Sequence, residues 1–429
     1  METQSALLVQ RRSENEPDLL PEFEAIATTA GYTIVGTFDV VGAPSARFGI
    51  STGKVEEIAT YLEIESVDFI LFSSQLKSSQ LFRLMERFEI EVRDRSQVIL
   101  EIFDRHAQTP QAKLQIEQAR LRYELPFERH QIKMRLQHEH TGDRPTTDQV
   151  GAGEDLLTKR MSEIRKRISI IEEKLRKISQ AQDLKRKRRS RIGFLEVTLA
   201  GYTNAGKSTL HNALTGSDVE IADRMFTTLS TKTTRLESMN RQVVISDSVG
   251  FISDLPDSLL KAFNTTLMEI SEADVIILVV DASDPISEME RKVETCLVTF
   301  ADIEANGIPI VMALNKIDLI SSDDLSLKMQ HFQKYVNSIV AISARDEIGF
   351  DELLLTVEHE LPKLYTYYIE LPYGDEGMSL LSWLHENGNV NNSEYTTSTI
   401  QVVAELAIEM VQRFIQMHPD IQVRRSELE

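Results

Sequence analysis

Apolar and polar positions alternate along the N-terminal third of the chain in a pattern that predicts a small α/β domain. Short apolar runs predict buried strands at residues 32–38 and 67–72, and helical spacing predicts helices at residues 54–61 and 79–88. Residues 98–105 and 113–123 also have helical spacing. We expect these last two segments to lead the chain away from the domain.

A regular apolar seam follows this domain. Its residues are separated by alternating steps of four and three, which is the spacing of helices that pack along their length. The seam consists of Leu157, Met161, Ile164, Ile168, Ile171, Leu175 and Ile178. We therefore expect a long helix that belongs to a helical hairpin or a short coiled coil. Residues 143–153 are rich in Pro, Gly, Thr and Asp and predict a loop or linker before it.

From residue 194 onward, apolar strands alternate with amphipathic helices, which is typical of a doubly wound α/β domain. Strands are expected at residues 195–200, 243–246, 275–281, 308–314 and 338–342. Beyond Pro362 a small α+β segment is expected, with a strand at residues 365–371, a helix at 374–385 and a less regular pattern at 396–417. The expected parts of the chain are residues 1–142, 143–192, 193–362 and 363–429.

Length and composition are those of a globular protein with several domains. The 429 residues exceed what one hydrophobic core usually supports, and 41% hydrophobic and 27% charged residues argue against wholesale disorder. The longest apolar runs, at residues 275–280 and 308–314, are far shorter than the roughly 20 residues of a membrane-spanning helix. We expect no stable insertion into a membrane.

The N-terminus and the single cysteine bear on the compartment. Residues 1–13 lack the basic stretch, apolar core and cleavage site of an export signal. Cys296 cannot form an internal disulfide, which fits a reducing compartment, and its expected role is that of a small core residue. The expected location is the cytoplasm, with peripheral attachment to a membrane left open, and the expected state is a monomer.

Charge is distributed unevenly. The formal net charge is −20, yet residues 156–191 contain 14 Lys or Arg against 4 Asp or Glu. The predicted long helix ends in a basic cluster at residues 185–191. One basic element on an acidic body is typical of a contact with nucleic-acid phosphates, although a solvated helix face has the same composition.

A phosphate-binding loop is predicted after the strand at residues 195–200. Residues 201–208 match the pattern GxxxxGK[ST], with the strand before it and the helix after it that this motif requires. Backbone N–H groups and the helix N-terminus would bind the phosphates. We expect Lys207 to neutralise the β- and γ-phosphates and Ser208 to bind Mg²⁺. The alternative is a glycine-containing turn that binds nothing.

Further metal and phosphate ligands follow in order along the chain. Asp247 ends the next strand and is expected to hold the metal through water, and Gly250 is expected to offer its N–H to the γ-phosphate. Alone, such an Asp is usually a turn residue or a helix cap. The threonine-rich segment at residues 226–234 lies in the position of a first switch. We expect Thr228 to complete the Mg²⁺ shell, with Thr227 as the second choice.

The tetrad NKID at residues 315–318 predicts recognition of guanine. Asp318 can accept hydrogen bonds from the N1–H and the exocyclic amine of guanine, and adenine has no such pair of donors. Asn315 would brace the loop and touch the base edge, and the stem of Lys316 would cover the flat face of the base. Ser343-Ala344 could offer a backbone N–H to the guanine O6. The alternative is a charged loop on a solvated surface.

These motifs together predict the residues that contact GTP. They are Gly201, Tyr202, Thr203, Asn204, Ala205, Gly206, Lys207, Ser208, Thr209, Phe226, Thr227, Thr228, Leu229, Ser230, Asp247, Ser248, Val249, Gly250, Asn315, Lys316, Ile317, Asp318, Ser343, Ala344 and Arg345. Lys207, Thr228 and Gly250 are the expected catalytic residues. Ser208, Thr228 and Asp247 are the expected Mg²⁺ ligands.

The residue after Gly250 bears on the rate of hydrolysis. In Ras-like proteins a Gln that orients the attacking water follows this motif, whereas this chain has Phe251. We therefore expect slow intrinsic hydrolysis unless another group, a partner or a monovalent cation assists. Asn204 could provide a side-chain oxygen for such a cation, K⁺ being the candidate.

With these residues in place, the chain resembles the HflX family of Obg/HflX-like translational GTPases. The resemblance rests on GYTNAGKSTL, FTTL, SVGFI, VVDASDP and NKID, and it extends to residues 49–58, 94–105 and 112–126. It covers the chain to about residue 371. It implies a P-loop NTPase fold with a Ras-like G domain and a mostly parallel sheet, joined to an N-terminal α/β domain and a coiled-coil linker.

The resemblance also implies a function. A member of this family would bind the large ribosomal subunit and its ribosomal RNA, hydrolyse GTP to GDP and phosphate when the ribosome stimulates it, and split or rescue stalled or idle ribosomes. Its N-terminal domain and linker would reach toward the peptidyl-transferase region.

The chain departs from the family pattern in three places. It has GAGE at residues 151–154 where the family has a stretch like GPGETQLE, it has Ser248 where Thr is usual, and its C-terminal segment diverges. The first departure concerns linker geometry and the ribosome contact. The change from Thr to Ser should scarcely affect nucleotide binding.

Two other functions remain open from the sequence. A GTP-controlled RNA-binding or ribosome-assembly switch would dock on ribosome precursors. A P-loop ATPase is the weakest alternative because of Asn315, Lys316 and Asp318, and it would require tighter binding of ATP than of GTP.

Overall fold

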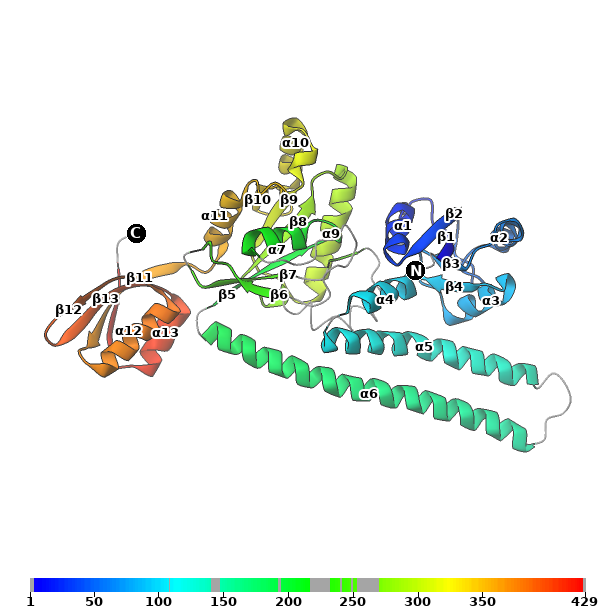
Figure 1. Ribbon diagram of the computed structural model, residues 1–429, viewed down its shortest axis with the longest axis horizontal. Coiled ribbons are helices and arrows are strands. Elements are labelled where there is room, and N and C mark those ends of the chain that lie inside the picture. Colours follow the sequence, from blue (N-terminus) through cyan, green and yellow to red (C-terminus); the bar gives the residue numbers. More distant parts are fainter. Residues whose placement is uncertain are drawn as a thin grey trace. The chain divides into compact units, whose positions relative to one another are not determined.

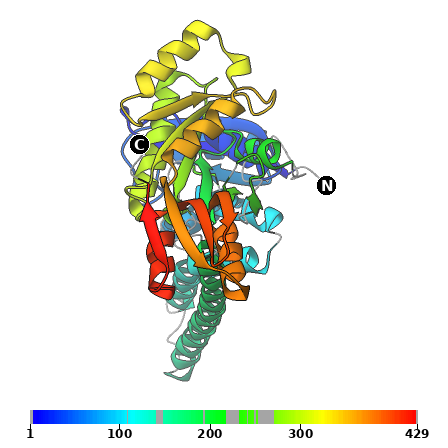
Figure 2. The ribbon, with the colours of Figure 1, turned by 90° about the vertical axis from the view of Figure 1, so that its left-hand side faces the viewer.

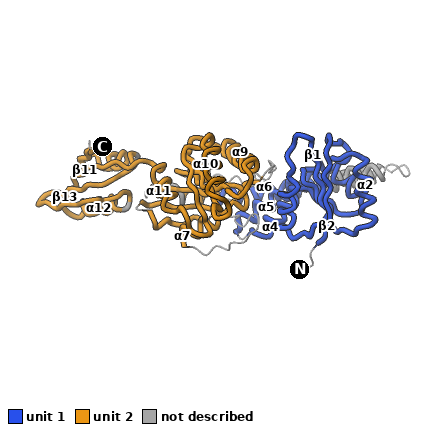
Figure 3. The backbone as a smooth tube through the Cα atoms, turned by 90° about the horizontal axis from the view of Figure 1, so that it is seen from above, with its two compact units in different colours: residues 1–178, 223–230, 254–264 blue, residues 179–222, 231–253, 265–429 orange. Residues whose placement is uncertain are grey.

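The computed structural model describes residues 4–107, 109–139, 147–191, 194–216, 232–239, 241–247, 250–252 and 270–426 (Figure 1). The chain divides into two compact units (Figure 3). One contains the chain from Met1 to Ile178, and the other contains nearly all of the chain from Ser179 onward. Within the described residues, no helix combines the length and the apolar character needed to cross a membrane.

The first unit begins with a four-stranded parallel sheet in the order β2-β1-β3-β4. Its strands are β1 (Gln4–Arg12), β2 (Tyr32–Val41), β3 (Phe69–Phe72) and β4 (Glu91–Asp94). Its helices are α1 (Leu20–Thr29), α2 (Thr52–Ile64), α3 (Ser78–Phe88) and α4 (Arg95–His106). Leu7, Ile58, Ile70 and Leu84 are fully buried in one core. The expected α/β domain is confirmed, and β1, α1 and β4 are additions to it. The expectation that residues 98–105 lead the chain away from the domain is wrong, because α4 buries Ile99 and Phe103 within it.

Two long helices follow, α5 (Pro110–Glu139) and α6 (Thr147–Arg191). They run antiparallel side by side, since Gln118 near the start of α5 donates to Glu172 at 3.3 Å while Glu128 lies 4.0 Å from Arg160, earlier on α6. The seam residues Met161, Ile164 and Ile171 are buried in this pairing. The expected helical hairpin is therefore confirmed over its described part.

The expected loop at residues 143–153 is wrong in its second half. Helix α6 already begins at Thr147, so Gly151 and Gly153 lie inside it. Each glycine in a helix interior costs about 1 kcal/mol relative to alanine. The packed apolar seam of this 45-residue helix stabilises it by more than that cost. Local composition does not reveal this stabilisation, because it comes from packing along the whole helix.

The second unit contains a six-stranded sheet in the order β10-β9-β8-β5-β7-β6, in which β6 alone is antiparallel to its neighbour. The strands are β5 (Leu195–Gly201), β6 (Lys232–Arg235), β7 (Val243–Asp247), β8 (Val275–Asp281), β9 (Ile310–Asn315) and β10 (Ser338–Ala341). All five strands expected from the sequence are confirmed, and β6 is an addition.

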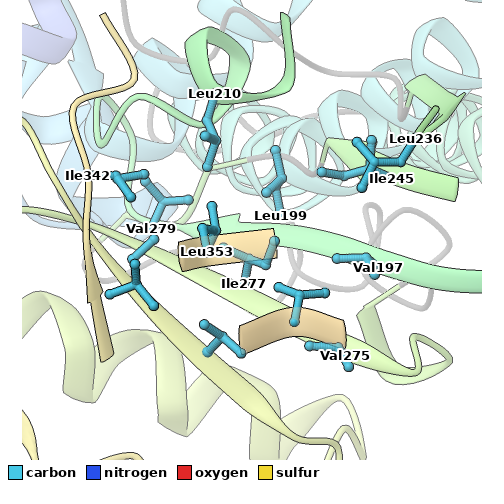
Figure 4. Close-up of a cluster of buried hydrophobic side chains, with 14 of the residues drawn as sticks. Val197, Leu199, Leu210, Leu236, Ile245, Val275, Ile277, Val279, Ile342 and Leu353 are labelled. Carbon is cyan, nitrogen blue, oxygen red and sulfur yellow. The ribbon is translucent and has the colours of Figure 1, made fainter. Parts of the chain in front are cut away.

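Helices cover this sheet and fill its core. They are α7 (Lys207–Thr215), α9 (Ile286–Asp302), α10 (Ser322–Phe332), α11 (Phe350–Glu360) and the short 3₁₀ helix η1 (Ile317–Leu319). Leu199, Ile277 and Leu353 belong to the apolar cluster between sheet and helices (Figure 4). Because β5, β7, β8 and β9 are parallel, their carboxyl ends meet at one edge, where ligands of doubly wound sheets bind.

The C-terminal residues form a third sheet in the order β12-β13-β11-β14, with antiparallel pairing throughout (Figure 2). Its elements follow as β11 (Leu364–Pro372), α12 (Asp375–Asn387), β12 (Asn389–Tyr395), β13 (Thr399–Ala407), α13 (Ile408–Met417) and β14 (Gln422–Arg425). This βαββαβ order is that of ferredoxin-like domains. Along β11, Tyr367, Ile369 and Leu371 are buried while Tyr368 and Glu370 are exposed, so the helices cover one face of the sheet. The expected small α+β segment is confirmed.

Candidate functional site

The turn between β5 and α7 encloses the ammonium group of Lys207. Its Nζ donates to the carbonyl oxygens of Gly201 at 3.1 Å and Tyr202 at 2.8 Å. The side chain is only 7% exposed. Burial lowers the pKa of Lys207, and the nearby Asp247 carboxylate opposes that shift. A buried cation surrounded by backbone groups is a ready binding point for an anion, because phosphate oxygens would supply the negative charge that burial otherwise makes costly.

Gly206 joins this turn to α7 and needs to be glycine. Its φ is +96°, a left-handed conformation, and it caps the N-terminus of the helix. A Cβ at this position would lie 2.2 Å from Nδ2 of Asn315. Glycine therefore lets the turn lead directly into α7 beside Asn315, and the N-terminus of a helix is a site that binds phosphate.

Two oxygen atoms suited to a hard metal ion lie side by side at the start of α7. Ser208 Oγ donates to Asp247 Oδ2 at 2.8 Å, and Asp247 is 3% exposed at the end of β7. Hydroxyl and carboxylate oxygens are ligands that Mg²⁺ prefers. In the part of the chain that the structure describes, no group of three or more His, Cys, Asp or Glu side chains could hold a metal. A metal at Ser208 and Asp247 would thus be completed by other oxygen ligands, such as water and nucleotide phosphates.

The backbone of Phe251 is attached to the phosphate-binding turn. Its N–H donates to Gly201 O at 3.0 Å, and its carbonyl accepts from Thr203 N at 2.8 Å. The ring is 4% exposed and packs edge to face on Phe300 of α9, with ring centroids 5.6 Å apart. Its side chain therefore belongs to the core. The preceding Gly250 lies close to the turn, where an added Cβ would be 2.8 Å from Lys207 Nζ.

Asn315, the last residue of β9, connects three loops. Its Nδ2 donates to Ala205 O and its Oδ1 accepts from Ala344 N, both at 2.8 Å, and the residue is 2% exposed. Ala205 belongs to the phosphate-binding turn and Ala344 follows β10. The bracing role expected of Asn315 is thus present in the geometry.

The next residues of this loop are oriented by neighbouring side chains. Asp318 lies in η1, and its Oδ1 accepts a hydrogen bond from Ser343 Oγ at 2.7 Å. Lys316 has a left-handed φ of +66°, and its Nζ lies 2.6 Å from Asp281 Oδ2. The structure therefore brings the two expected guanine-reading segments, NKID and Ser343-Ala344, together at the carboxyl edge of the sheet. The backbone N–H groups of Ser343 and Ala344 donate to Ile348 O and Asn315 Oδ1, so the N–H expected to face guanine O6 already has a protein acceptor in this structure.

Comparison with known proteins gives the family. Residues 196–316 match the model of the 50S ribosome-binding GTPase domain, residues 18–104 that of the GTP-binding GTPase N-terminal domain, and residues 106–189 that of the GTP-binding GTPase middle region. The GTPase HflX of Thermococcus kodakarensis is 35% identical over 92% of this chain and 90% of its own length. The chain belongs to the HflX family of GTPases.

A second HflX relative and one solved structure also resemble this chain. The GTPase HflX of Caldanaerobacter subterraneus is 33% identical over 94% of this chain and 90% of its own. A crystal structure of SsGBP with GDP is similar over 83% of this chain and 98% of that one, at 26% identity and a TM-score of 0.47. As an HflX-family GTPase, the protein binds GTP and hydrolyses it.

In this HflX GTPase the described part of the expected site is assembled at one edge of one sheet. The turn from Gly201 to Ser208, the Asp247 carboxylate, Gly250 and the NKID loop all lie there. Asn204 has a left-handed φ of +62° and is exposed, and Arg345 is exposed as well. The expected contacts at Phe226, Thr227, Thr228, Leu229, Ser230, Ser248 and Val249 lie outside the described residues.

Two residues of the HflX site had no role assigned from the sequence, Asp281 and Lys328. Asp281 ends β8 beside Asn315, and Lys328 of α10 donates from a 4% exposed position to Ala282 O at 2.8 Å. A carboxylate at the end of a strand adjacent to the NKID strand was a signal for Asp281. Nothing in the helical pattern of residues 322–332 marks Lys328, because a lysine there usually lies on the solvated face.

Proposed function

We propose that this HflX GTPase binds the large ribosomal subunit in its GTP-bound state and separates stalled or idle ribosomes into subunits. The observation that carries the proposal is the match of residues 196–316 to a domain model described as a 50S ribosome-binding GTPase, within a chain that matches HflX proteins along most of its length. Ribosome binding would couple the state of the nucleotide to the position of the subunits.

The charge on α6 supports a contact with ribosomal RNA. Lys159, Arg165, Lys166 and Lys174 are exposed, and residues 156–191 carry 14 Lys or Arg against 4 Asp or Glu. Contacts of lysine and arginine with phosphates are largely independent of base sequence and weaken as salt is raised. The binding should therefore fall steeply with ionic strength.

The site supports specific roles in GTP binding. We assign the β- and γ-phosphates to Lys207, the base edge to Asp318, and Mg²⁺ to Ser208 and Asp247, with Thr228 as a further ligand. When bound, Mg²⁺ would neutralise charge that develops on the phosphates. Burial of the Phe251 ring against Phe300 leaves that position without a group that could orient water, which supports slow intrinsic hydrolysis and stimulation by the ribosome.

Co-sedimentation with purified ribosomal subunits tests the proposal. The protein should pellet with large subunits in a non-hydrolysable GTP analogue, pellet less in GDP, and show faster GTP hydrolysis when large subunits are added. Intact ribosomes should separate into subunits in the presence of GTP. Failure of large subunits both to bind the protein and to raise hydrolysis would refute the ribosome role, and binding confined to immature particles would favour an assembly switch.

Base recognition by Asp318 has its own test. Changing Asp318 to Asn replaces an acceptor pair with one acceptor and one donor, and the donor can reach the O2 of xanthine. The variant should lose affinity for GDP and gain affinity for XDP. Unchanged preference for GDP would remove Asp318 from the base edge.

A potassium requirement is the remaining part of the proposal. Asn204 projects from the phosphate-binding turn in an exposed, left-handed conformation, so its amide oxygen can face a cation beside the phosphates. Hydrolysis should be faster in KCl than in NaCl of equal ionic strength, and Asn204→Ala should abolish the difference. Equal rates in the two salts would refute this assignment.

A further inference from the structure

The end of β8 and the residue after it are joined to the NKID loop at two points and to α10 at a third. Asp281 Oδ2 lies 2.6 Å from Lys316 Nζ, and Ala282 N donates to Asn315 O at 2.8 Å. On the other side, Lys328 Nζ donates to Ala282 O at 2.8 Å while pairing with Asp324 at 2.6 Å. Consecutive residues of one loop thus hold consecutive residues of the other.

The Asp281 carboxylate is also held by hydrogen bonds that do not involve Lys316. Its other oxygen, Oδ1, accepts from the backbone N–H of Ser283 at 2.9 Å and from the Ser283 hydroxyl at 2.6 Å. In the sheet, Asp281 is paired directly with Asn315. The side chain of Asp281 is 14% exposed and that of Lys316 27%. Because both oxygens have partners in a sheltered position, the carboxylate presents one well-defined anchor to the ammonium group.

The ion pair with Asp281 fixes the position of the four-carbon stem of Lys316. Its backbone is held in a left-handed conformation, with φ at +66°, and its ammonium is held at Asp281, so the four-carbon stem must span the distance between them. A free lysine side chain loses considerable rotamer freedom when it is ordered. An ion pair that already orders it removes that loss from the binding step, which is how a rigid site gains affinity.

We propose that Asp281 is a positioning residue for guanine recognition, which orders the stem of Lys316 as an apolar platform for the flat face of the base. The inference rests on the proposed role of residues 315–318 in binding guanine. Asp281 acts on the face of the base through Lys316, and Asp318 acts on its edge. Lys328 supports the position of Asp281, because it donates a hydrogen bond to the carbonyl of the next residue, Ala282.

A double-mutant cycle measures this effect. Asp281→Asn keeps an oxygen that can accept from Ser283 and removes the charge that holds Lys316, and Lys316→Met keeps an apolar stem without the ammonium. Titration of fluorescent GDP should give roughly five- to tenfold weaker binding for each single variant. The double variant should be no weaker than either single variant by more than about twofold, because both remove the same ion pair.

Two further readouts separate positioning from damage to the loop. The ratio of affinities for GDP and IDP, which differ by the exocyclic amine at the base edge, should be unchanged in Asp281→Asn, since the platform contacts the face. A disordered loop would lower that ratio. Glu290→Gln is the matched control, because it removes a carboxylate on α9 that pairs at 2.5 Å with Lys334, just after α10, and that makes no contact with the NKID loop among its described partners. It should bind GDP as the unaltered protein does.

The outcomes distinguish this inference from the assignment on which it rests. If Asp318→Asn fails to shift the preference toward XDP, the guanine-binding role of the loop itself is refuted. If Asp318→Asn shifts the preference but Asp281→Asn binds GDP within twofold of the unaltered protein, or the losses multiply in the double variant, only the positioning role is overturned. If Asp281→Asn does not fold, Lys316→Met alone tests the positioning role. That role is overturned if Lys316→Met binds GDP as tightly as the unaltered protein does.

Discussion

Replacement of Gly206 by alanine should uncouple the phosphate-binding turn from the NKID loop. Alanine at the left-handed φ of +96° costs about 1 kcal/mol relative to glycine. Its Cβ would also lie 2.2 Å from Asn315 Nδ2, so the Asn315 side chain must turn away and lose its hydrogen bonds to Ala205 and Ala344. At about 1 kcal/mol for each hydrogen bond, the total loss is about 3 kcal/mol.

The chain offers a matched control in Gly216, at the other end of the same helix. Gly216 also has a left-handed φ, +62°, but a Cβ there would meet nothing within 4 Å. Gly216→Ala should therefore cost only about 1 kcal/mol. For a domain of this size, about 1 kcal/mol lowers the melting temperature by about 2–4 °C, so Gly206→Ala should lower it by about 6–12 °C.

Thermal unfolding of the two variants side by side, with GDP titration, checks this reasoning. Gly206→Ala should also weaken GDP binding, whereas Gly216→Ala should leave it nearly unchanged. In an Asn315→Ala background the extra cost of Gly206→Ala should shrink to about 1 kcal/mol, because the clash is gone. Equal losses for Gly206→Ala and Gly216→Ala, or a cost for Gly206→Ala that persists without the Asn315 side chain, would refute the coupling through Asn315.

Three other predictions follow from the site and its surroundings. Ser208→Ala removes the hydroxyl next to Asp247. Mg²⁺ raises the affinity for GTP, and this increase should be roughly tenfold smaller in the variant. Calorimetric titration with and without Mg²⁺ measures the increase, and an unchanged increase contradicts the assignment. Phe251→Gln should not speed hydrolysis, because the side chain at this position is buried in the core at 4% exposure. The buried amide should destabilise the protein by about 2–4 kcal/mol. A faster single-turnover rate would show instead that the residue reaches the nucleotide. Cys296 should resist thiol reagents in the native protein, because burial raises its pKa to about 12 and only about one thiol in 10⁴ is ionised at pH 8; labelling by a colourimetric disulfide reagent should require denaturant, and rapid native labelling would contradict its burial.

The sequence predicted best where local pattern and function coincide. Each strand of the six-stranded sheet that ends in a site residue was found, because a buried parallel strand is a continuous apolar run bounded by the polar residues that carry the chemistry. The turn at residues 201–208 and the Ser343-Ala344 pair were located for the same reason. The fold class followed from the alternation of these strands with helices.

The sequence predicted least where stability comes from distant contacts. Strand β1 has only four consecutive apolar residues, Ala6 to Val9, and becomes a central strand because β2 and β3 pair with it on both sides. The glycines at 151 and 153 predict a loop that the long helix overrides. Asp281 was visible as a residue but not as a partner of Lys316, since their pairing depends on a register between β8 and β9 that no local pattern encodes.

The order of strands in the C-terminal sheet determines which shortened chains would keep it. Strand β14 is an edge and pairs with β11 over four residues only, from Tyr367 to Glu370. A chain ending after Met417 would lose that edge but retain both helices, with Phe414 still in the core. A chain ending before Thr399 would lose β13, which lies between β11 and β12, together with α13. A stop codon near residue 418 should thus be tolerated, and one only twenty codons earlier should remove the whole domain.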